Sequence, residues 1–416
     1  MIRRFVSAVT ATVLAVSILG ASQTPEVVGA TENWPAIFDP LVLQTLNLQL
    51  TSQDWDTIRR DTTNEIEVPA TFWADDETPI LVSVRRKSSR ALPSESNPIK
   101  VGLKIDINEL VDGQTWHGLN KLSLENGADA GVVEEGVAWN MHRMASAPEG
   151  DTYDAGFASW VRLNVNGVYI GVYVNAEQRD KQALRQRGLW VGGDTWLYEQ
   201  TTEGALLEEG DPDSPAIGHL CYSPFRTKSQ GGLCKTPNDT ALKADLPAWL
   251  DMDAFLTQCA VEALTDNKDG LCGHNNNAFF VDYSEARMAT GLRRTYFPWD
   301  LDTVFQSTKG NIYGLRSNKR LVQSSYESII LNHATFRAQY NAKILGLTDP
   351  ATGALSTSAL QAFLDQLQPV LGPALASEPY TSNEGGSITR LKSWLTERIS
   401  NARSQATANT NPSPRP

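Results

Sequence analysis

The sequence has little positive charge for its length and no basic run. Asp and Glu number 48 against 36 Lys and Arg, so the formal net charge is -12 at pH 7. A surface of this sign repels the phosphates of a nucleic acid, and no basic patch interleaved with aromatic residues offsets the repulsion. We therefore expect no nucleic-acid partner.

Several catalytic and metal-binding motifs are also missing. There is no C-x-x-C pair and no H-E-x-x-H helix, and the five histidines share no metal spacing, so a zinc site is not predicted. No G-x-S-x-G sequence is present, which argues against a serine hydrolase. A G-x-G-x-x-G loop is absent too, so a bound nucleotide must be held by other parts of the backbone.

Long hydrophobic runs are scarce, and the one that stands out is at the N-terminus. Met1 to Arg4 precede an apolar stretch from Phe5 to Gly20, and small residues follow. This order is typical of a signal peptide, and the stretch is shorter than the roughly 20 apolar residues that span a bilayer. We expect residues 1–22 to be removed. The mature chain should then be secreted or extracytoplasmic, in the periplasm or at the cell surface, without a stable membrane anchor.

Cysteine is rare, with four residues in the chain. In an exported protein cysteines are more often paired than free, because the compartment is oxidising. Four cysteines allow three connectivities. We favour Cys221 with Cys234 and Cys259 with Cys272, since each pair closes a short loop, but sequence alone leaves the other pairings open.

What the sequence does contain is 41% hydrophobic residues in patterns typical of a globular protein. Alternating apolar residues predict strands at residues 80–84 and 99–105, and a helical face is expected at residues 132–143. The run from Val161 to Val174 contains Asn166-Gly167, a pair that suits a type I′ turn. This run therefore predicts a β-hairpin.

From Leu246 onward the pattern is mainly helical. Helices are expected at residues 252–265, 327–347 and 359–371. One hairpin interrupts them, with strands at residues 278–283 and 294–297.

Together these patterns predict an α+β fold in two lobes. The first is sheet-rich and covers residues 33–200, and the second is helix-rich and covers residues 201–405. Residues 406–416 are polar and rich in proline, and we expect them to be disordered. No sign of oligomerisation is evident, so a monomer is expected.

One constellation of polar residues surrounds the second hairpin. Asp269 and the run Asn275 to Asn277 precede it, and Asp300 and Asp302 follow it. Because antiparallel strands return the chain to the edge where it started, Asn276 should lie beside Asp300, with Asp269 within reach. The hairpin therefore predicts a cluster of oxygen ligands drawn from distant parts of the sequence.

This order of Asp, Asn, hairpin and Asp is the layout used by phosphotransferases of the protein-kinase type. Carboxylate and amide oxygens hold the Mg²⁺ or Mn²⁺ that neutralises a nucleotide triphosphate such as ATP. Asp269 would accept or orient the proton of the attacking hydroxyl. Asp300, the Asn275 to Asn277 run and Asp302 are the predicted metal ligands.

Simpler interpretations of the same residues remain open. Asp and Asn are common in loops because they tolerate turn conformations, and Asp302 could cap a following turn. An extracellular cluster of this kind can also bind Ca²⁺ without catalysis.

The residues also resemble those of a known family, the CotH kinases, over most of the mature chain. Two segments in this order are the most specific, His274-Asn-Asn-Asn and Pro298-Trp-Asp-Leu-Asp. Other similar pieces are Val82-Ser-Val-Arg-Arg-Lys, Asn120-Lys-Leu-Ser-Leu-Glu-Asn, Gly136-Val-Ala-Trp, Leu163-Asn-Val-Asn-Gly-Val-Tyr-Ile-Gly-Val-Tyr, Glu177 and Leu197-Tyr.

The resemblance implies an atypical protein-kinase-like fold that binds ATP and a divalent metal. It also implies phosphorylation of Ser or Thr on a secreted or coat protein. By motif, Asp269 looks like the family's catalytic Asp and Asp300 like its metal-binding Asp. Asn276 or a neighbour would be similar to the kinase Asn that shares the metal.

A kinase needs a cation on the nucleotide phosphates and a carboxylate that holds this cation. Lys121, on the strand before the helix at residues 132–143, and Glu135, on that helix, are the predicted pair, with Lys104 as a substitute for the cation. The alternative is that these charged residues are simply solvated, as most are.

The chain departs from the family pattern at two places. It has Leu197-Tyr198-Glu199 where the family often has Leu-Tyr-Lys, and Glu134-Glu135-Gly136 where the family often has Arg-Glu-Lys. Both changes remove positive charge. A second function is therefore kept open, that of a non-catalytic pseudokinase acting in adhesion or assembly, with a structural metal.

Overall fold

The structure is a computed structural model. It describes residues 36–146, 155–201, 204–210, 246–274, 276–313, 334–380 and 388–408. The predicted signal peptide, Cys221, Cys234 and Asn275 lie outside the described residues.

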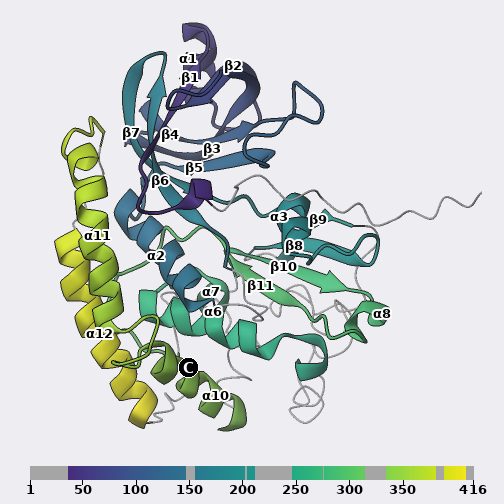
Figure 1. Cartoon of the computed structure of the whole chain (residues 1–416), viewed down its shortest axis with the longest axis vertical. Helices are drawn as coiled ribbons and strands as arrows, with labels where there is room; N and C mark the ends of the chain where they lie inside the picture. Colours follow the sequence, from purple (N-terminus) through teal and green to yellow (C-terminus); the bar gives the residue numbers. More distant parts are fainter. Residues whose placement is uncertain are drawn as a thin grey trace, which may run out of the picture.

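Seven strands close into a barrel at one end of the molecule (Figure 1). They are β1 (Gln44–Gln49), β2 (Glu67–Ala74), β3 (Ile80–Ser94), β4 (Asn97–Asp106), β5 (Lys121–Glu125), β6 (Ala158–Val165) and β7 (Val168–Ala176). Their order is β1-β2-β3-β4-β5-β7-β6, and parallel pairing of β1 with β6 closes the barrel. Alternate apolar residues such as Val82, Leu103 and Ile105 fill the interior, which confirms the predicted strands.

The hairpin between β6 and β7 forms where the sequence predicted it. Asn166 and Gly167 have φ values of 51° and 76°, and Val165 pairs with Val168. Positive φ at both turn residues is the requirement of a type I′ turn.

Helix α2 (Val132–Ala145) packs against the barrel, as expected from its pattern. Gly136 is needed at this contact, because a Cβ there would lie 2.3 Å from the ring of Trp160. The indole Nε1 of Trp160 donates to the carbonyl of Val132 at 2.7 Å. The close approach fixes α2 against β6 and so fixes the position of Glu135.

A second sheet has four antiparallel strands, in the order β11-β10-β8-β9. They are β8 (Thr195–Thr201), β9 (Gly204–Glu209), β10 (Ala278–Tyr283) and β11 (Thr295–Pro298). The predicted hairpin of β10 and β11 is confirmed, with α8 (Glu285–Met288) in its connection. The boundary expected between residues 200 and 201 falls inside the β8–β9 hairpin, so strands from both expected parts build this sheet.

Helices surround this sheet and one flank of the barrel (Figure 1). They are η1 (Ala36–Phe38), α1 (Ser52–Arg60), α3 (Lys181–Gln186), α6 (Met252–Thr265), α7 (Leu271–His274), α10 (Ala334–Leu347), α11 (Thr357–Ala376) and α12 (Ile388–Ala408). Helix α12 was not predicted from the sequence, although its buried residues Leu391, Leu395 and Ile399 have the spacing of one helical face. Because α12 continues through Ala408, residues 406–408 are helical, contrary to the predicted disorder.

The fold is therefore mixed α+β, as the sequence predicted. One hydrophobic core fills the barrel, and a second joins α2, the four-stranded sheet and the helices. None of the helices in the described part of the chain combines the length and apolar character needed to cross a membrane.

A buried ion pair fastens α11 to the barrel. The ammonium of Lys100, on β4, pairs with the carboxylate of Glu378, just beyond α11, and both side chains are 2% exposed. The same carboxylate accepts from the backbone N–H of Val172 at 3.2 Å. The hydroxyl of Tyr169 donates to the carbonyl of Ala374 at 3.2 Å. The C-terminal helices are thus tied to β4 and β7.

Candidate functional site

The ends of the β10–β11 hairpin form the centre of the site. Ala278 pairs with Pro298, and the N–H of Trp299 donates to the carbonyl of Asn277 at 3.0 Å. The next residue, Asp300, and Asn277 both have positive φ, 49° and 50°. Asn and Asp tolerate this left-handed conformation better than most residues. The backbone therefore leaves the regular strand conformation just before β10 and just after β11.

Of the three consecutive asparagines, Asn277 connects the two acids. Its Nδ2 donates to Oδ2 of Asp269 at 3.2 Å and to the carbonyl of Asp300 at 3.4 Å. Asn276, which was expected beside Asp300, donates its backbone N–H to the carbonyl of Gly270 at 3.4 Å. Asn275 lies outside the described residues.

The two acids at the strand exit, Asp300 and Asp302, are part-buried and repel one another. Burial raises the pKa of Asp300, and the charges of Asp269 and Asp129 raise it further, while Lys87 opposes them. Burial and the neighbouring Asp300 raise the pKa of Asp302 to about 7. Neighbouring carboxylates whose pKa values are raised in this way are typical of sites that bind a cation.

Asp302 does not cap a helix. Its Oδ1 accepts from the hydroxyl of the adjacent Thr303 at 3.1 Å, and no helix begins between residues 303 and 313. The side chain instead faces a pocket of about 400 Å³, which Asp129, Glu134 and Arg390 also line.

The predicted cation, Lys121, lies elsewhere. Its Nζ is 3.0 Å from Oδ2 of Asp106, its side chain is 45% exposed, and the two residues are direct partners on β5 and β4. Glu135 is buried and does not pair with it. The predicted pair of Lys121 and Glu135 is therefore wrong, because Lys121 starts its strand at the solvent-exposed end.

The cation near Glu135 is Lys87, on β3. Its ammonium pairs with Glu125 at the end of β5 and lies 4.6 Å from the centroid of the Trp299 ring. Burial lowers the pKa of Lys87, while the charges of Asp300 and Glu135 raise it. Lys87 is therefore close to both the carboxylate of Glu135 on α2 and that of Asp300 at the strand exit.

Lys104, the predicted substitute, does face the site. It is the β4 partner of Ser123, whose hydroxyl donates to the Glu125 carboxylate that holds Lys87. Burial and the nearby Lys87 lower the pKa of Lys104 to about 8, and Glu199 on β8 opposes this. The barrel thus presents two lysines toward the four-stranded sheet.

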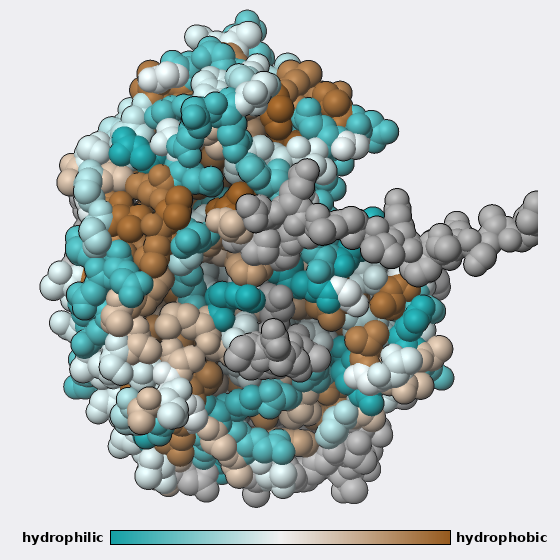
Figure 2. All heavy atoms as spheres, in the orientation of Figure 1, coloured by the Kyte–Doolittle hydropathy of each residue, from teal (hydrophilic) through white to brown (hydrophobic). Residues whose placement is uncertain are grey.

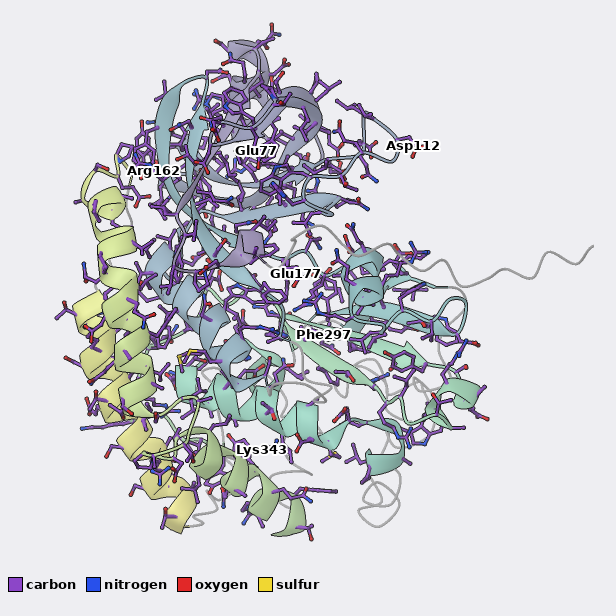
Figure 3. All side chains as sticks on the ribbon, in the orientation of Figure 1. Glu77, Asp112, Arg162, Glu177, Phe297 and Lys343 are labelled. Carbon is purple, nitrogen blue, oxygen red and sulfur yellow. A yellow bond between two sulfur atoms is a disulfide. The ribbon has the colours of Figure 1, made fainter. Side chains whose placement is uncertain are left out.

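The linker after β7 leads from the barrel toward the four-stranded sheet and packs on β11. Figure 3 shows Glu177 above Phe297 at this level, and Figure 2 shows a recess between the barrel and the part below it. Glu177 accepts from both terminal nitrogens of Arg187, at 2.8 and 2.6 Å. The guanidinium of Arg179 lies 5.1 Å from the Phe297 ring centroid, which fixes the linker onto β11.

The residues fit a divalent ion bound together with phosphate. No group of three or more His, Cys, Asp or Glu side chains in the described chain can hold a metal by itself. Mg²⁺ in kinases needs only one or two carboxylates, and substrate phosphates complete its shell. One buried carboxylate oxygen of Glu135 also has no hydrogen-bond partner among the described residues. The site can therefore take up a cation and a charged ligand together.

The comparison with family models adds to this geometry. The model for CotH kinase protein matches residues 82–402. The chain belongs to the CotH kinase family. The comparison with curated proteins finds no match. Membership of the CotH kinase family assigns a kinase-like function at a coarse level, and the family implies ATP and a divalent metal in general.

The structure gives a reason for each departure from the family pattern. Glu134 accepts from Arg390 of α12 at 2.6 Å, and Gly136 leaves room for the Trp160 ring. Glu199 faces the site, where burial and Glu208 raise its pKa and Lys104 and Lys87 lower it. In this member of the CotH kinase family, the carboxylate of Glu199 on β8 is therefore close to the two lysines of the barrel.

The sequence patterns did not predict three residues that build this site, namely Lys87, Glu125 and Glu262. For Lys87 a signal existed, because strand alternation in Val82-Ser-Val-Arg-Arg-Lys places Arg85 and Lys87 on one face. For Glu262 there was none, since it lies inside an apolar helix and the backbone amides that it binds, at the start of α7, come nine and ten residues later.

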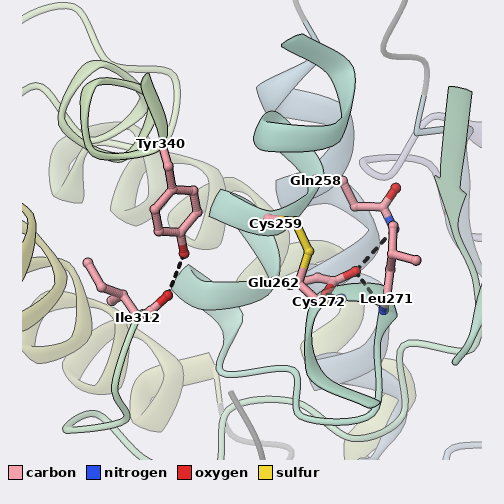
Figure 4. Close-up of a disulfide and its surroundings, with 7 residues drawn as sticks. All are labelled: Gln258, Cys259, Glu262, Leu271, Cys272, Ile312 and Tyr340. Carbon is pink, nitrogen blue, oxygen red and sulfur yellow. Dashed lines mark hydrogen bonds between the residues drawn. A yellow bond between two sulfur atoms is a disulfide. The ribbon is translucent and has the colours of Figure 1, made fainter. Parts of the chain in front are cut away.

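Glu262 and a disulfide support the loop that carries Asp269. Figure 4 shows the disulfide between Cys259 on α6 and Cys272 on α7, with a Cα–Cα distance of 5.5 Å, which confirms the favoured pairing of these two cysteines. The carboxylate of Glu262 accepts from the N–H of Leu271 at 3.1 Å and of Cys272 at 2.7 Å. Burial nevertheless raises the pKa of Glu262 to about 7.

This raised pKa predicts a pH-dependent stability. The folded pKa of about 7 lies above the usual 4.5, so Glu262 stabilises the fold most below pH 4.5 and the gain is lost as pH rises through 7. Between pH 4.5 and pH 7 the free energy of unfolding of wild type should fall by about 3 kcal/mol, whereas that of a Glu262→Gln variant should not show this fall. Urea unfolding of both proteins at several pH values measures the difference. Parallel pH curves for the two proteins would contradict it.

Proposed function

We propose that this chain is a protein kinase that transfers the γ-phosphoryl group of ATP to a Ser or Thr hydroxyl of an exported or coat protein. It would use Mg²⁺ or Mn²⁺. The identity of the acceptor protein is left open by the chain itself. The proposal extends the kinase-like function of the family to a specific reaction and a specific group of residues.

One observation carries the proposal: cationic side chains on the barrel face carboxylates at the end of the β10–β11 hairpin. Lys87 is close enough to Asp300 and Asp302 for their charges to raise its pKa. A nucleotide triphosphate needs both signs of charge, since its phosphates require cations and its metal requires carboxylates. Few other ligands have this double requirement.

Each residue has a role that follows from its surroundings. Lys87 would contact the phosphates, held by Glu125 and approached by Glu135. Asp300 and Asn277, with Asp302 alongside, would hold the ion, which when bound neutralises charge on the phosphates. Asp269 is part-buried and is connected to Asp300 through Asn277, so it would orient the acceptor hydroxyl and take its proton.

The proposal includes a two-lobed, kinase-like arrangement and an extracytoplasmic location. The barrel with α2 would be the first lobe and the four-stranded sheet with the later helices the second. The Cys259–Cys272 disulfide supports an oxidising compartment, as does the N-terminal sequence of residues 1–22.

Incubation of the purified protein with γ-labelled ATP and Mn²⁺, with a Ser- and Thr-rich acceptor such as casein, tests the reaction. Wild type should transfer label, and both Asp269→Ala and Asp300→Ala should lose the transfer. Asp365→Ala, at a carboxylate that is 69% exposed on α11, is the matched control and should retain it. Equal transfer by all four proteins would show that the label moves without this site.

A non-catalytic function in adhesion or assembly is the second candidate, and Glu199 is the observation that favours it. This carboxylate faces the lysines from β8 and would repel a triphosphate. Metal binding by wild type without any label transfer, measured by Mn²⁺ titration, would support this second function.

A further inference from the structure

Glu262 is buried in the middle of α6, with its side chain directed at the loop between α6 and α7. Its carboxylate accepts three hydrogen bonds, from the N–H of Leu271, the N–H of Cys272 and, at 3.0 Å, the side-chain amide of Gln258 (Figure 4). The residue is 1% exposed. A buried carboxylate is costly unless donors surround it, and here two of the donors are consecutive backbone amides.

The loop wraps closely around this one side chain. At its start the N–H of Asn267 donates to the carbonyl of Glu262 at 2.9 Å. A Cβ at Gly270 would lie 2.7 Å from the carboxylate carbon of Glu262, so a larger residue there would displace this carboxylate. The Cys259–Cys272 disulfide ties the far end of the loop to the same helix. These contacts therefore fix the backbone conformation of residues 267–272 around Glu262.

Asp269 lies at the midpoint of this path. Its own N–H donates to Oδ1 of Asn267 at 3.0 Å, and the carbonyl of the next residue, Gly270, accepts from Asn276. Glu262 thus contacts residues on the C-terminal side of Asp269 and, through its carbonyl, on the N-terminal side. No contact between Glu262 and Asp269 itself is needed for the carboxylate to set the position of Asp269.

We propose that Glu262 is a positioning residue for Asp269. By holding the amides of Leu271 and Cys272 it keeps Asp269 at hydrogen-bonding distance from Asn277 and hence level with Asp300. The inference rests on the proposed function for its kinetic consequence, although the hold on the loop can be measured independently. A shift of about 1 Å in a group of this kind lowers rates by about 10²-fold.

The test compares Glu262→Gln with wild type and with Tyr340→Phe. Glutamine has the shape of glutamate but presents an amide N–H₂ to one of the donors, so one hydrogen bond becomes a repulsion. Tyr340→Phe removes a different buried hydrogen bond, to the carbonyl of Ile312, in the same hydrophobic core. It reports the effect of losing core stability alone. Two readouts are used, amide hydrogen exchange over residues 267–274 and the kcat and KM for ATP.

Under the proposal, exchange over residues 267–274 is faster in Glu262→Gln than in wild type and unchanged in Tyr340→Phe. In the same variant kcat falls about 10²-fold while KM for ATP stays near the wild-type value, because the lysines that bind the nucleotide are untouched. Equal exchange in all three proteins, or equal kcat in the two variants, would overturn it.

The two proposals fail in different ways. If wild type transfers no phosphate, the proposed reaction is wrong, and hydrogen exchange still decides whether Glu262 holds the loop. If Glu262→Gln does not fold, the double variant Cys259→Ala and Cys272→Ala removes the other tether and leaves the carboxylate in place. Slow exchange at residues 271–272 in this double variant supports the role of Glu262, and rapid exchange there assigns the hold to the disulfide and overturns it.

Discussion

Lys87→Met is expected to slow phosphoryl transfer by about 10²–10³-fold, because it removes the charge that would contact the transferring phosphates. Lys87 is the cation that lies between Glu125 and Asp300, above the ring of Trp299. Methionine is similar in length and keeps the contact with the ring. The KM for ATP and the kcat, measured with Mn²⁺ and the acceptor used for wild type, give the effect.

Lys121→Met is the matched control, since it makes the same chemical change on another strand of the barrel, β5. Lys121 pairs with Asp106 at a partly exposed position, and exposed ion pairs of this kind contribute little. We expect near-wild-type transfer. The reverse outcome, with Lys121→Met inactive and Lys87→Met active, would restore the pairing that the sequence suggested. Unfolding curves recorded for both variants separate loss of charge from loss of fold.

Glu378→Ala is expected to destabilise the protein by about 3–5 kcal/mol. The substitution leaves the ammonium of Lys100 buried with no carboxylate beside it, and burial already lowers the pKa of this lysine. It also removes the acceptor for the N–H of Val172. Urea unfolding followed by tryptophan fluorescence measures the loss.

The double variant Lys100→Met with Glu378→Leu is the control for this prediction. It removes both charges and keeps apolar volume, so it should recover most of the stability that the single variant loses. If the free energy of unfolding of Glu378→Ala is within about 1 kcal/mol of the wild-type value, water reaches Lys100 and the ion pair is not buried as described.

Local patterns were enough to predict the parts of the fold that depend on neighbours in sequence. The turn at Asn166-Gly167 and the β10–β11 hairpin follow from turn chemistry and strand alternation, and the helix α6 follows from its period. The closure of the barrel could not be predicted in this way, because it depends on the pairing of β1 with β6, more than a hundred residues apart in the chain. Helix α12 was not predicted, although its buried residues recur every three or four positions as in an amphipathic helix.

The same distinction applies to the site. Asp269 and Asp300 were predicted together because one precedes and the other follows a single hairpin, and Asn277 hydrogen-bonds both residues. The cation was assigned to Lys121 because its strand precedes α2 directly, whereas the barrel brings Lys87 to Glu125 from two strands away, across β4. Sequence proximity to a helix says little about which strand faces it. The hydrogen bonds of Asn277 to Asp269 and to the carbonyl of Asp300 depend on a left-handed backbone turn that the hairpin pattern does not predict.

The left-handed backbone at Asn277 and Asp300 limits the protein scaffolds onto which these site residues could be transferred. A flat, regular strand holds φ near -120° to -140°, and a residue there sends its side chain straight out from the sheet. If the same amino acids were grafted onto such a strand in another scaffold, they would point away from each other. A designer would need to copy the turn at both strand ends, and could use only Gly, Asn or Asp there without strain.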